Sequence, residues 1–160
     1  MSTQYWLMKT EPTTYSIDDL IAETTTQWEG VRNYQARNFM RDHMKIGDKV
    51  LFYHSNCKPP GVVGLAEVCR LAYPDYFALD ASSKYFDPKA TEEKPIWMMV
   101  DVKFVKKFDH IVSLDQLKAE PSLVDMMVIK KGSRLSIQPV TKAEYDVVCN
   151  MATEKSKNKE

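Results

Sequence analysis

The sequence has no net charge, no long hydrophobic run and no secretion signal, and each absence argues against a class of protein. Its 22 basic residues are balanced by 22 acidic residues, which argues against binding nucleic acid mainly through phosphate neutralisation. A base-reading pocket with a local basic rim remains compatible with that balance. No apolar run approaches the roughly 18 residues of a membrane-spanning helix, and the first residues lack the basic and apolar regions of a signal peptide. We therefore expect a cytoplasmic protein without a membrane partner.

The sequence also has few cysteines and none of the familiar catalytic motifs. Its three cysteines form no CxxC pair, which argues against a zinc site and against a disulfide framework. Motifs of the types GxGxxG, GxxxxGKS, HExxH and GxSxG are absent. The histidines do not stand at ligand spacing to one another: His43, His54 and His110. We therefore predict no metal, no cofactor and no enzymatic activity.

Two features keep an enzymatic alternative open. His54 and Cys57 share one loop and are candidates for a catalytic dyad, although such proximity is more often coincidence. Asp18 and Asp19 are adjacent carboxylates. They follow Ser16 at the spacing of a helix start, however, where the helix dipole favours acidic side chains.

The length and the periodicity of the chain predict one α+β domain. The chain has 160 residues and no internal repeat or linker, which is the size of a single domain. We place this domain at residues 1–153 and expect the charged and polar residues 154–160 to form a disordered tail. Because helices and strands alternate without a regular βαβ rhythm, we expect a small mixed β-barrel with flanking helices.

Apolar and β-branched runs predict strands that share one curved sheet or barrel, and helix-start signals predict helices between them. The expected strands are Tyr5–Met8, Lys49–Tyr53, Gly61–Leu71, Ile96–Phe108 and Arg134–Val140. Three helices are expected to begin after the caps Ser16, Ser113 and Thr141. Two further helices are expected at Asn33–Met44 and Leu123–Met127.

The segment from Trp28 to Asn38 combines the residue types that bind a nucleobase. An aromatic face stacks on the plane of a base, and an asparagine amide pairs with its edge. We therefore predict that Trp28 and Asn33 form a base-reading pair. The alternative is that Asn33 only caps the following helix and that Trp28 fills the core.

Basic and polar residues elsewhere are candidates for the rim of such a pocket. Arg32, Arg37 and Arg41 fall near one helix start, which predicts a local positive patch. Arg134 follows a glycine and either contacts phosphate or is solvated. The polar residues after the strand Lys49–Tyr53 line a pocket mouth or form an ordinary turn.

Eight segments of the sequence resemble the EVE domain family, and together they extend from Tyr5 to about Tyr145. They are YWLMKTEP, YSIDDL, WEGVRNYQARNFMR, GDKVLFYHS, PGVVGLAEV, AYPD, WMMVDVKF and GSRLSIQPV. The resemblance implies a PUA-like fold, which is a small pseudo-barrel with flanking helices. It also implies recognition of modified bases, chiefly modified cytosines in DNA, with bases in RNA as a second option.

Carried onto this chain, the resemblance implies a pocket with a polar rim. The pocket residues would be Lys9, Trp28, Val31, Arg32, Asn33, Tyr34, Tyr53, Ser55 and Trp97, and the rim would be completed by Arg134 and Ser136. From its residues alone, Trp97 reads as a core residue in a strand.

The combined hypothesis is a monomeric, non-catalytic reader of a modified base in DNA or RNA. The base would be flipped out of its stack, held by aromatic contact and read at its edge by polar groups. Two rivals remain. One is a nucleotide- or RNA-modifying enzyme that uses the same pocket, and the other is a protein-interaction module with a vestigial pocket.

Overall fold

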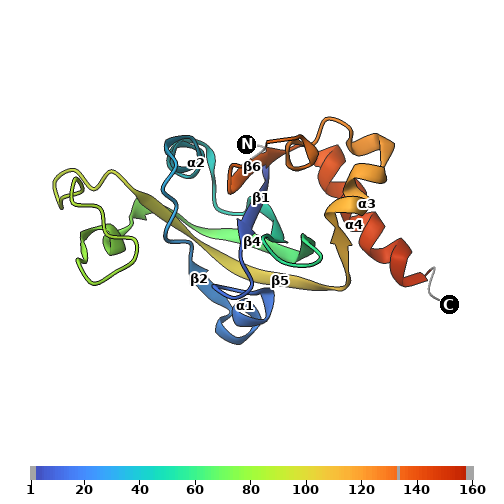
Figure 1. The fold of residues 1–160 in the computed structure, drawn as a ribbon, viewed down its shortest axis with the longest axis horizontal. Helices are drawn as coiled ribbons and strands as arrows, with labels where there is room; N and C mark the ends of the chain where they lie inside the picture. Colours follow the sequence, from blue (N-terminus) through green and yellow to red (C-terminus); the bar gives the residue numbers. More distant parts are fainter. Residues whose placement is uncertain (1–2, 133, 158–160) are drawn as a thin grey trace.

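The computed structural model describes residues 3–132 and 134–157, and its centre is one mixed six-stranded sheet (Figure 1). The strands run in the spatial order β2-β5-β4-β3-β1-β6. β1 pairs with β3 in parallel, and the other neighbours pair antiparallel. The strand bounds are β1 Tyr5–Thr10, β2 Thr25–Gln27, β3 Lys49–His54, β4 Gly61–Pro74, β5 Met98–Ser113 and β6 Ile137–Val140.

The mixed sheet with flanking helices is as expected, but the described sheet is open, so the prediction that it forms a small β-barrel is wrong. β2 has only three residues and pairs with β5 alone, and β6 has four residues and pairs with β1 alone. β6 also contains Pro139, which has no N–H to offer a further strand. Two short edge strands, one of them carrying a proline, leave the sheet with two separate edges.

The prediction that five strands share one sheet is confirmed, with shifted ends. β5 continues to Ser113 because its last residues pair with the start of β4, where Gly61 lies opposite Ser113. β6 begins later than expected. The Ser136 carbonyl accepts from the Lys9 N–H at 2.8 Å, and the Leu135 carbonyl accepts from the Gln138 side chain at 2.9 Å.

The helices begin largely where the capping signals indicate. Ser16 with Asp19, and Ser113 with Gln116, form reciprocal capping boxes, and Thr141 accepts from the Glu144 N–H at 3.1 Å. The expected helix at Leu123–Met127 is instead two short 3-10 turns. The bounds are α1 Ile17–Glu23, α2 Tyr34–Asn38, the π-helical η1 Phe39–His43, η2 Tyr76–Leu79, α3 Leu114–Ala119, η3 Pro121–Leu123, η4 Met127–Ile129 and α4 Lys142–Lys157.

The backbone of α4 is helical as far as Lys157, within the segment where a tail was expected, and residues 158–160 lie outside the described residues. No helix in the described part of the chain is long and apolar enough to cross a membrane.

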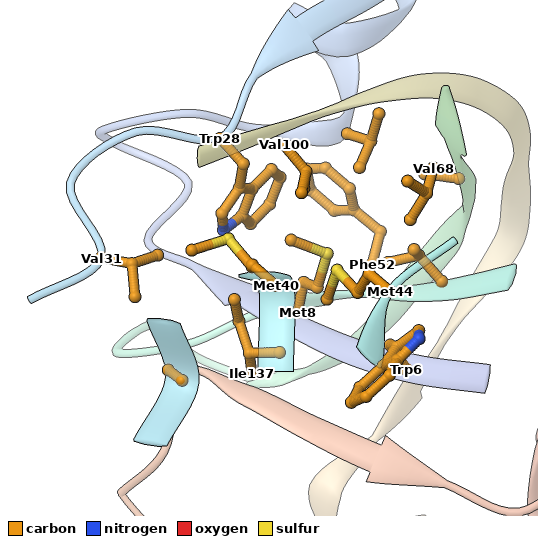
Figure 2. Close-up of a cluster of buried hydrophobic side chains, with 14 of the residues drawn as sticks. Trp6, Met8, Trp28, Val31, Met40, Met44, Phe52, Val68, Val100 and Ile137 are labelled. Carbon is orange, nitrogen blue, oxygen red and sulfur yellow. The ribbon is translucent and has the colours of Figure 1, made fainter. Parts of the chain in front are cut away.

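Alternation along the strands divides the core between the two faces of the sheet. Trp6 and Met8 of β1 belong to one cluster, which Figure 2 shows, and Leu7 between them belongs to the other. Helices α3 and α4 cover the second face, where Leu117 and Val148 pack (Figure 1).

The segment between β4 and β5, residues 75–97, is called the lobe below and extends away from the sheet at the left of Figure 1. It has a small core of its own, in which Trp97 packs with Ala78 and Ala90. Its two ends are joined by a hydrogen bond from the Asp75 N–H to the Trp97 carbonyl at 2.9 Å. The lobe is therefore an ordered substructure, with a core of its own, at the border of the sheet.

Candidate functional site

A cavity of about 400 Å³ lies where the lobe meets the end of β1 and the segment after β2. This cavity is called the base cavity below. It is lined by Lys9, Thr10, Glu11, Thr14, Tyr15, Thr26, Gln27, Trp28, Glu29, Gly30, Val31, Lys84, Tyr85 and Ser136. Four residues singled out from the sequence thus come together here: Lys9, Trp28, Val31 and Ser136.

Trp28 serves both the core and the cavity. Only 7% of its surface is exposed, and its ring meets Phe52 edge-on with centroids 5.6 Å apart. In Figure 2 it lies at one end of the first core cluster, with Trp6 at the other end. Its backbone N–H donates to the Val100 carbonyl at 2.8 Å, which extends the β2–β5 pairing. The sheet therefore holds Trp28 in place at the wall of the cavity, which this residue helps to line.

Gly30 allows the lobe to close over the cavity. Its φ is +84°, which favours glycine, and a Cβ placed there would lie 2.5 Å from the Tyr85 ring. The ring of Tyr85, a cavity residue from the lobe, therefore packs directly on the backbone next to Trp28. A side chain at position 30 would push this ring away.

Arg32 braces the cavity from behind and does not line it. Its guanidinium donates to the Tyr85 carbonyl at 2.7 and 3.2 Å. It also donates to the carbonyl of the preceding residue, Val31, at 2.9 Å and to the Asp75 carboxylate at 2.9 Å. Asp75 is 1% exposed and also accepts from the Gly30 and Phe77 N–H groups at 2.9 and 3.0 Å. This network fixes both Gly30 and Tyr85 in place.

Asn33 begins α2 and does not line the base cavity. Its side-chain oxygen accepts from the Ala36 N–H at 3.0 Å, so the capping alternative describes its observed contact. The side chain is exposed, on a chain that has turned away from the cavity after Val31. The pairing of Trp28 with Asn33 across one base is therefore not formed in this structure.

The other aromatic and arginine residues after Asn33 join α2 to the lobe. Tyr34 is 59% exposed and stacks on Trp97 with centroids 4.9 Å apart. Arg37 lies over the Tyr34 ring at 4.9 Å and donates to the Ile96 carbonyl at 3.0 Å. The Trp97 Nε1–H donates to Asp87 at 2.7 Å, inside the lobe. Among the described residues, this group lies outside the lining of the base cavity.

The remaining predicted residues are dispersed. Tyr53 is buried beside Lys9, whose Nζ lies 5.7 Å from the ring centroid, and borders a neighbouring cleft instead. Ser55 donates its backbone N–H to Thr10 at 2.9 Å. Arg41 is exposed and pairs with Asp42 at 2.8 Å, and Arg134 is exposed just before β6. The expected rim is therefore spread along the chain, with only Ser136 at the cavity.

Burial shapes the charges of the cavity. It lowers the pKa of Lys9. It also raises the pKa of Glu29, an effect that the nearby carboxylates of Asp75 and Glu23 strengthen and Lys84 opposes. Burial, helped by a hydrogen bond from its hydroxyl to Glu23 at 2.6 Å, raises the pKa of Tyr15. The cavity thus combines aromatic residues with a few polar side chains whose ionised forms are disfavoured by burial.

The residues of the enzymatic alternative have structural partners. The His54 Nε2 accepts from the Ile17 N–H at 3.1 Å and so supports the start of α1, and burial lowers the pKa of this imidazole. The Cys57 thiol donates to the Pro59 carbonyl at 3.6 Å, and burial raises its pKa. Within the described residues, no group of His, Cys, Asp and Glu is arranged to hold a metal ion.

Several cavity residues were missed from the sequence. Glu29 and Tyr15 stand within the motifs WEGV and YSIDDL, and Asp75, which holds Gly30 and Arg32 behind the cavity, stands within AYPD. These motifs were visible in the sequence, but nothing in them indicated the role of these three residues. Tyr85 and Lys84 belong to an irregular stretch without periodicity, so no pattern in the sequence indicated them.

Comparison with known proteins gives the chain a family. A model of the EVE domain matches residues 4–151. Thymocyte nuclear protein 1 of Rattus norvegicus is 42% identical, covering 93% of this chain and 74% of the relative.

Two solved structures are also similar. A hypothetical protein from Leishmania major is 54% identical, with a TM-score of 0.93 and coverage of 97% of this chain and 98% of that one. Human THYN1 protein, in complex with DNA containing 5-methylcytosine, is 41% identical, with a TM-score of 0.87 and coverage of 94% and 98%. The chain therefore belongs to the EVE domain family.

Proposed function

We propose that this protein reads a modified nucleobase, a modified cytosine in DNA above all, by holding the flipped base in the base cavity. The observation that carries the proposal is the cavity itself, in which two aromatic residues, Trp28 and Tyr85, line one space of about 400 Å³. That volume lies within the range of roughly 300–1,000 Å³ typical of small-molecule sites, and aromatic faces are the groups on which bases stack.

Polar groups of the cavity supply the means to distinguish one base from another. Glu29 and Gln27 line the cavity next to Trp28. A carboxylate accepts from the N4 amino group of cytosine, and a glutamine amide offers both a donor and an acceptor. In this proposal Trp28 and Tyr85 set the affinity for any base, and Glu29 with Gln27 sets the preference for cytosine.

Membership of the EVE domain family supports the proposal from outside this chain. The human THYN1 protein, which shares the fold over nearly the whole chain, was crystallised with DNA containing 5-methylcytosine. We further assign the open sheet to the PUA-like group that the family resemblance implies.

The proposed role is binding without catalysis. The support for this is that His54 and Cys57 have other hydrogen-bond partners and do not line the cavity. Mass spectrometry of a modified oligonucleotide incubated with the protein should show an unchanged mass. A new product would favour the enzymatic alternative instead.

Titration of labelled oligonucleotides that carry cytosine or 5-methylcytosine, single-stranded and double-stranded, tests the proposal. The wild type should bind the 5-methylcytosine strand more tightly. Tyr85→Leu removes a flat face from the cavity and should weaken binding to both strands by roughly 5- to 150-fold, which corresponds to about 1–3 kcal/mol for base stacking.

Tyr34→Leu is the matched control, because Tyr34 belongs to the same aromatic group but does not line the cavity. It should leave both affinities unchanged. Equal binding of the two strands by the wild type would contradict base reading, and no binding at all would favour the protein-interaction module.

A further inference from the structure

A second cleft, of about 430 Å³, opens on the other side of Lys9 from the base cavity. We call it the lysine cleft. It is bordered by Lys9, Tyr53, Lys118, Lys130, Lys131 and Gly132, with apolar side chains between them. Lys9 borders both spaces, and the segment that contains Gly132 leads directly to Ser136 at the base cavity. The two sites are therefore neighbours along one surface.

The charge of this cleft is of one sign. Among the described residues that line it, four are lysines and none is acidic. Some lysines elsewhere are neutralised in ion pairs, such as Lys107–Asp18 at 2.7 Å and Lys142–Asp146 at 2.8 Å. In the described part of the chain, Lys118, Lys130 and Lys131 form no ion pair. A protein of zero net charge thus concentrates unbalanced positive charge at one place.

Local structure explains why the lysines converge. Lys118 stands one helical turn after Leu114 on α3, so both face the cleft, whereas the neighbouring Asp115 belongs to another face. Lys130 follows η4, and Gly132 has a φ of +78° with open space where a Cβ would stand. The chain therefore turns at Gly132 and exposes its backbone at the cleft.

The floor of the cleft is uncharged. Tyr53 is buried, and burial raises its pKa to about 12, so its hydroxyl stays protonated at neutral pH. A neutral phenol in a cleft that is also lined by several lysines suits an anion whose oxygens accept hydrogen bonds. It does not suit a cation or an apolar peptide.

We infer that the lysine cleft binds the phosphodiester backbone next to the base held in the base cavity. The inference rests on the proposed function. A flipped base stays attached to its strand, so the flanking phosphates must cross the surface that borders the cavity. The lysine cleft is a part of that surface whose described lining residues include four lysines and no acidic residue. In this inference the sequence-independent part of the affinity comes from these lysines and not from the arginines that were predicted for the rim.

The salt dependence of oligonucleotide binding tests the inference. Lys118→Gln, Lys130→Gln and Lys131→Gln should each weaken binding of cytosine and 5-methylcytosine strands by the same factor. Each should also reduce the slope of log affinity against log salt by about 0.7 for a single strand. Lys45→Gln is the control. Lys45 is also exposed, but it precedes the start of β3, whereas Tyr53 of the cleft lies near the other end of this six-residue strand.

A double-mutant cycle identifies the contacted group. Replacing one flanking phosphate by an uncharged methylphosphonate should weaken binding of the wild type. At the contacted linkage the same replacement should have no further effect on the lysine variants, whereas it should affect Lys45→Gln as it affects the wild type. Inorganic phosphate at millimolar concentration should not compete, because a lone ion lacks the tethering base.

The two proposals fail separately. If the wild type prefers 5-methylcytosine but the cleft variants behave like Lys45→Gln, the cleft inference is wrong and base reading stands. If the wild type binds both strands equally and the cleft variants reduce that binding and its salt slope, base reading is wrong and the cleft stands. If no strand binds, or if phosphate alone competes fully, the cleft is not a backbone site.

Discussion

One continuous run, from Trp28 to Arg37, performs two different tasks on either side of Val31. The residues Trp28–Val31 line the base cavity, whereas Arg32 and its successors hold the lobe and α2 together. The division falls where Asn33 caps α2 and the chain turns away. Residue types suited to contact a base can therefore serve equally well to build the wall that positions those contacts.

The bracing half of this run depends on buried charge, and Asp75→Ala is expected to have the largest effect. The substitution leaves Arg32 without its carboxylate and two backbone N–H groups without an acceptor. Breaking a buried pair in this way costs about 3–5 kcal/mol, which urea unfolding measures. Asp42→Ala, which removes an exposed pair with Arg41, is the control and should change nothing measurable. An equal effect of the two substitutions would show that the brace is unimportant.

Disrupting the contact between Gly30 and Tyr85 is expected to have the next largest effect on stability. Gly30→Ala and Gly47→Ala both place a side chain at positive φ, which costs about 1–2 kcal/mol. Only position 30 has a ring 2.5 Å from the new Cβ, since position 47 has nothing within 4 Å. Gly30→Ala should therefore lose more stability than Gly47→Ala, and it alone should weaken oligonucleotide binding. Identical behaviour of both variants would contradict the role of Gly30 in closing the cavity.

Asn33 stands at the boundary between the two halves of the run, and its replacement should have a smaller effect on stability. Asn33→Ala removes the cap of α2 and should cost about 1 kcal/mol of stability. Asn33→Ser keeps a capping oxygen and should recover most of it in thermal unfolding. Neither substitution should alter the ratio of affinities for modified and unmodified strands. A changed ratio would return Asn33 to the base-reading role that the sequence suggested.

Among the effects on stability, that of Glu29 should be the smallest, and it should appear in the pH dependence of unfolding. Burial raises its pKa in the folded state, so between the ordinary carboxyl pKa and the raised value the unfolded chain releases its proton first. Wild-type stability should therefore fall relative to Glu29→Gln as the pH rises from about 4 to about 7. Urea unfolding at both pH values measures the difference. A wild type that gains stability relative to the variant would show that the carboxylate is favourably paired instead.

Much of the fold was predictable because it follows from local rules. Apolar runs such as KVLFY and capping signals such as Ser16 with Asp19 act over a few residues, and the structure confirms both. Closure of the sheet was not predictable in this way. It depends on whether β2 and β6 meet, and those strands are far apart in sequence and too short to give a pattern.

The candidate site was predictable only in part, for the same reason. Trp28 and Lys9 follow from motifs next to strands, and they do line the cavity. Tyr85 reaches the cavity only through the long-range contacts that Arg32 makes with it and with Asp75. The sequence of the irregular lobe carries no periodicity to indicate such contacts, so the hydrogen bonds by which Arg32 holds Tyr85 were not predictable from it.

A crystal structure of the protein with a short single strand containing one 5-methylcytosine would show where the modified base binds. We expect the base to lie in the base cavity against Trp28 and Tyr85, near Glu29, while Asn33 still caps α2. A base stacked instead on the exposed face of Tyr34, with the base cavity empty, would contradict it.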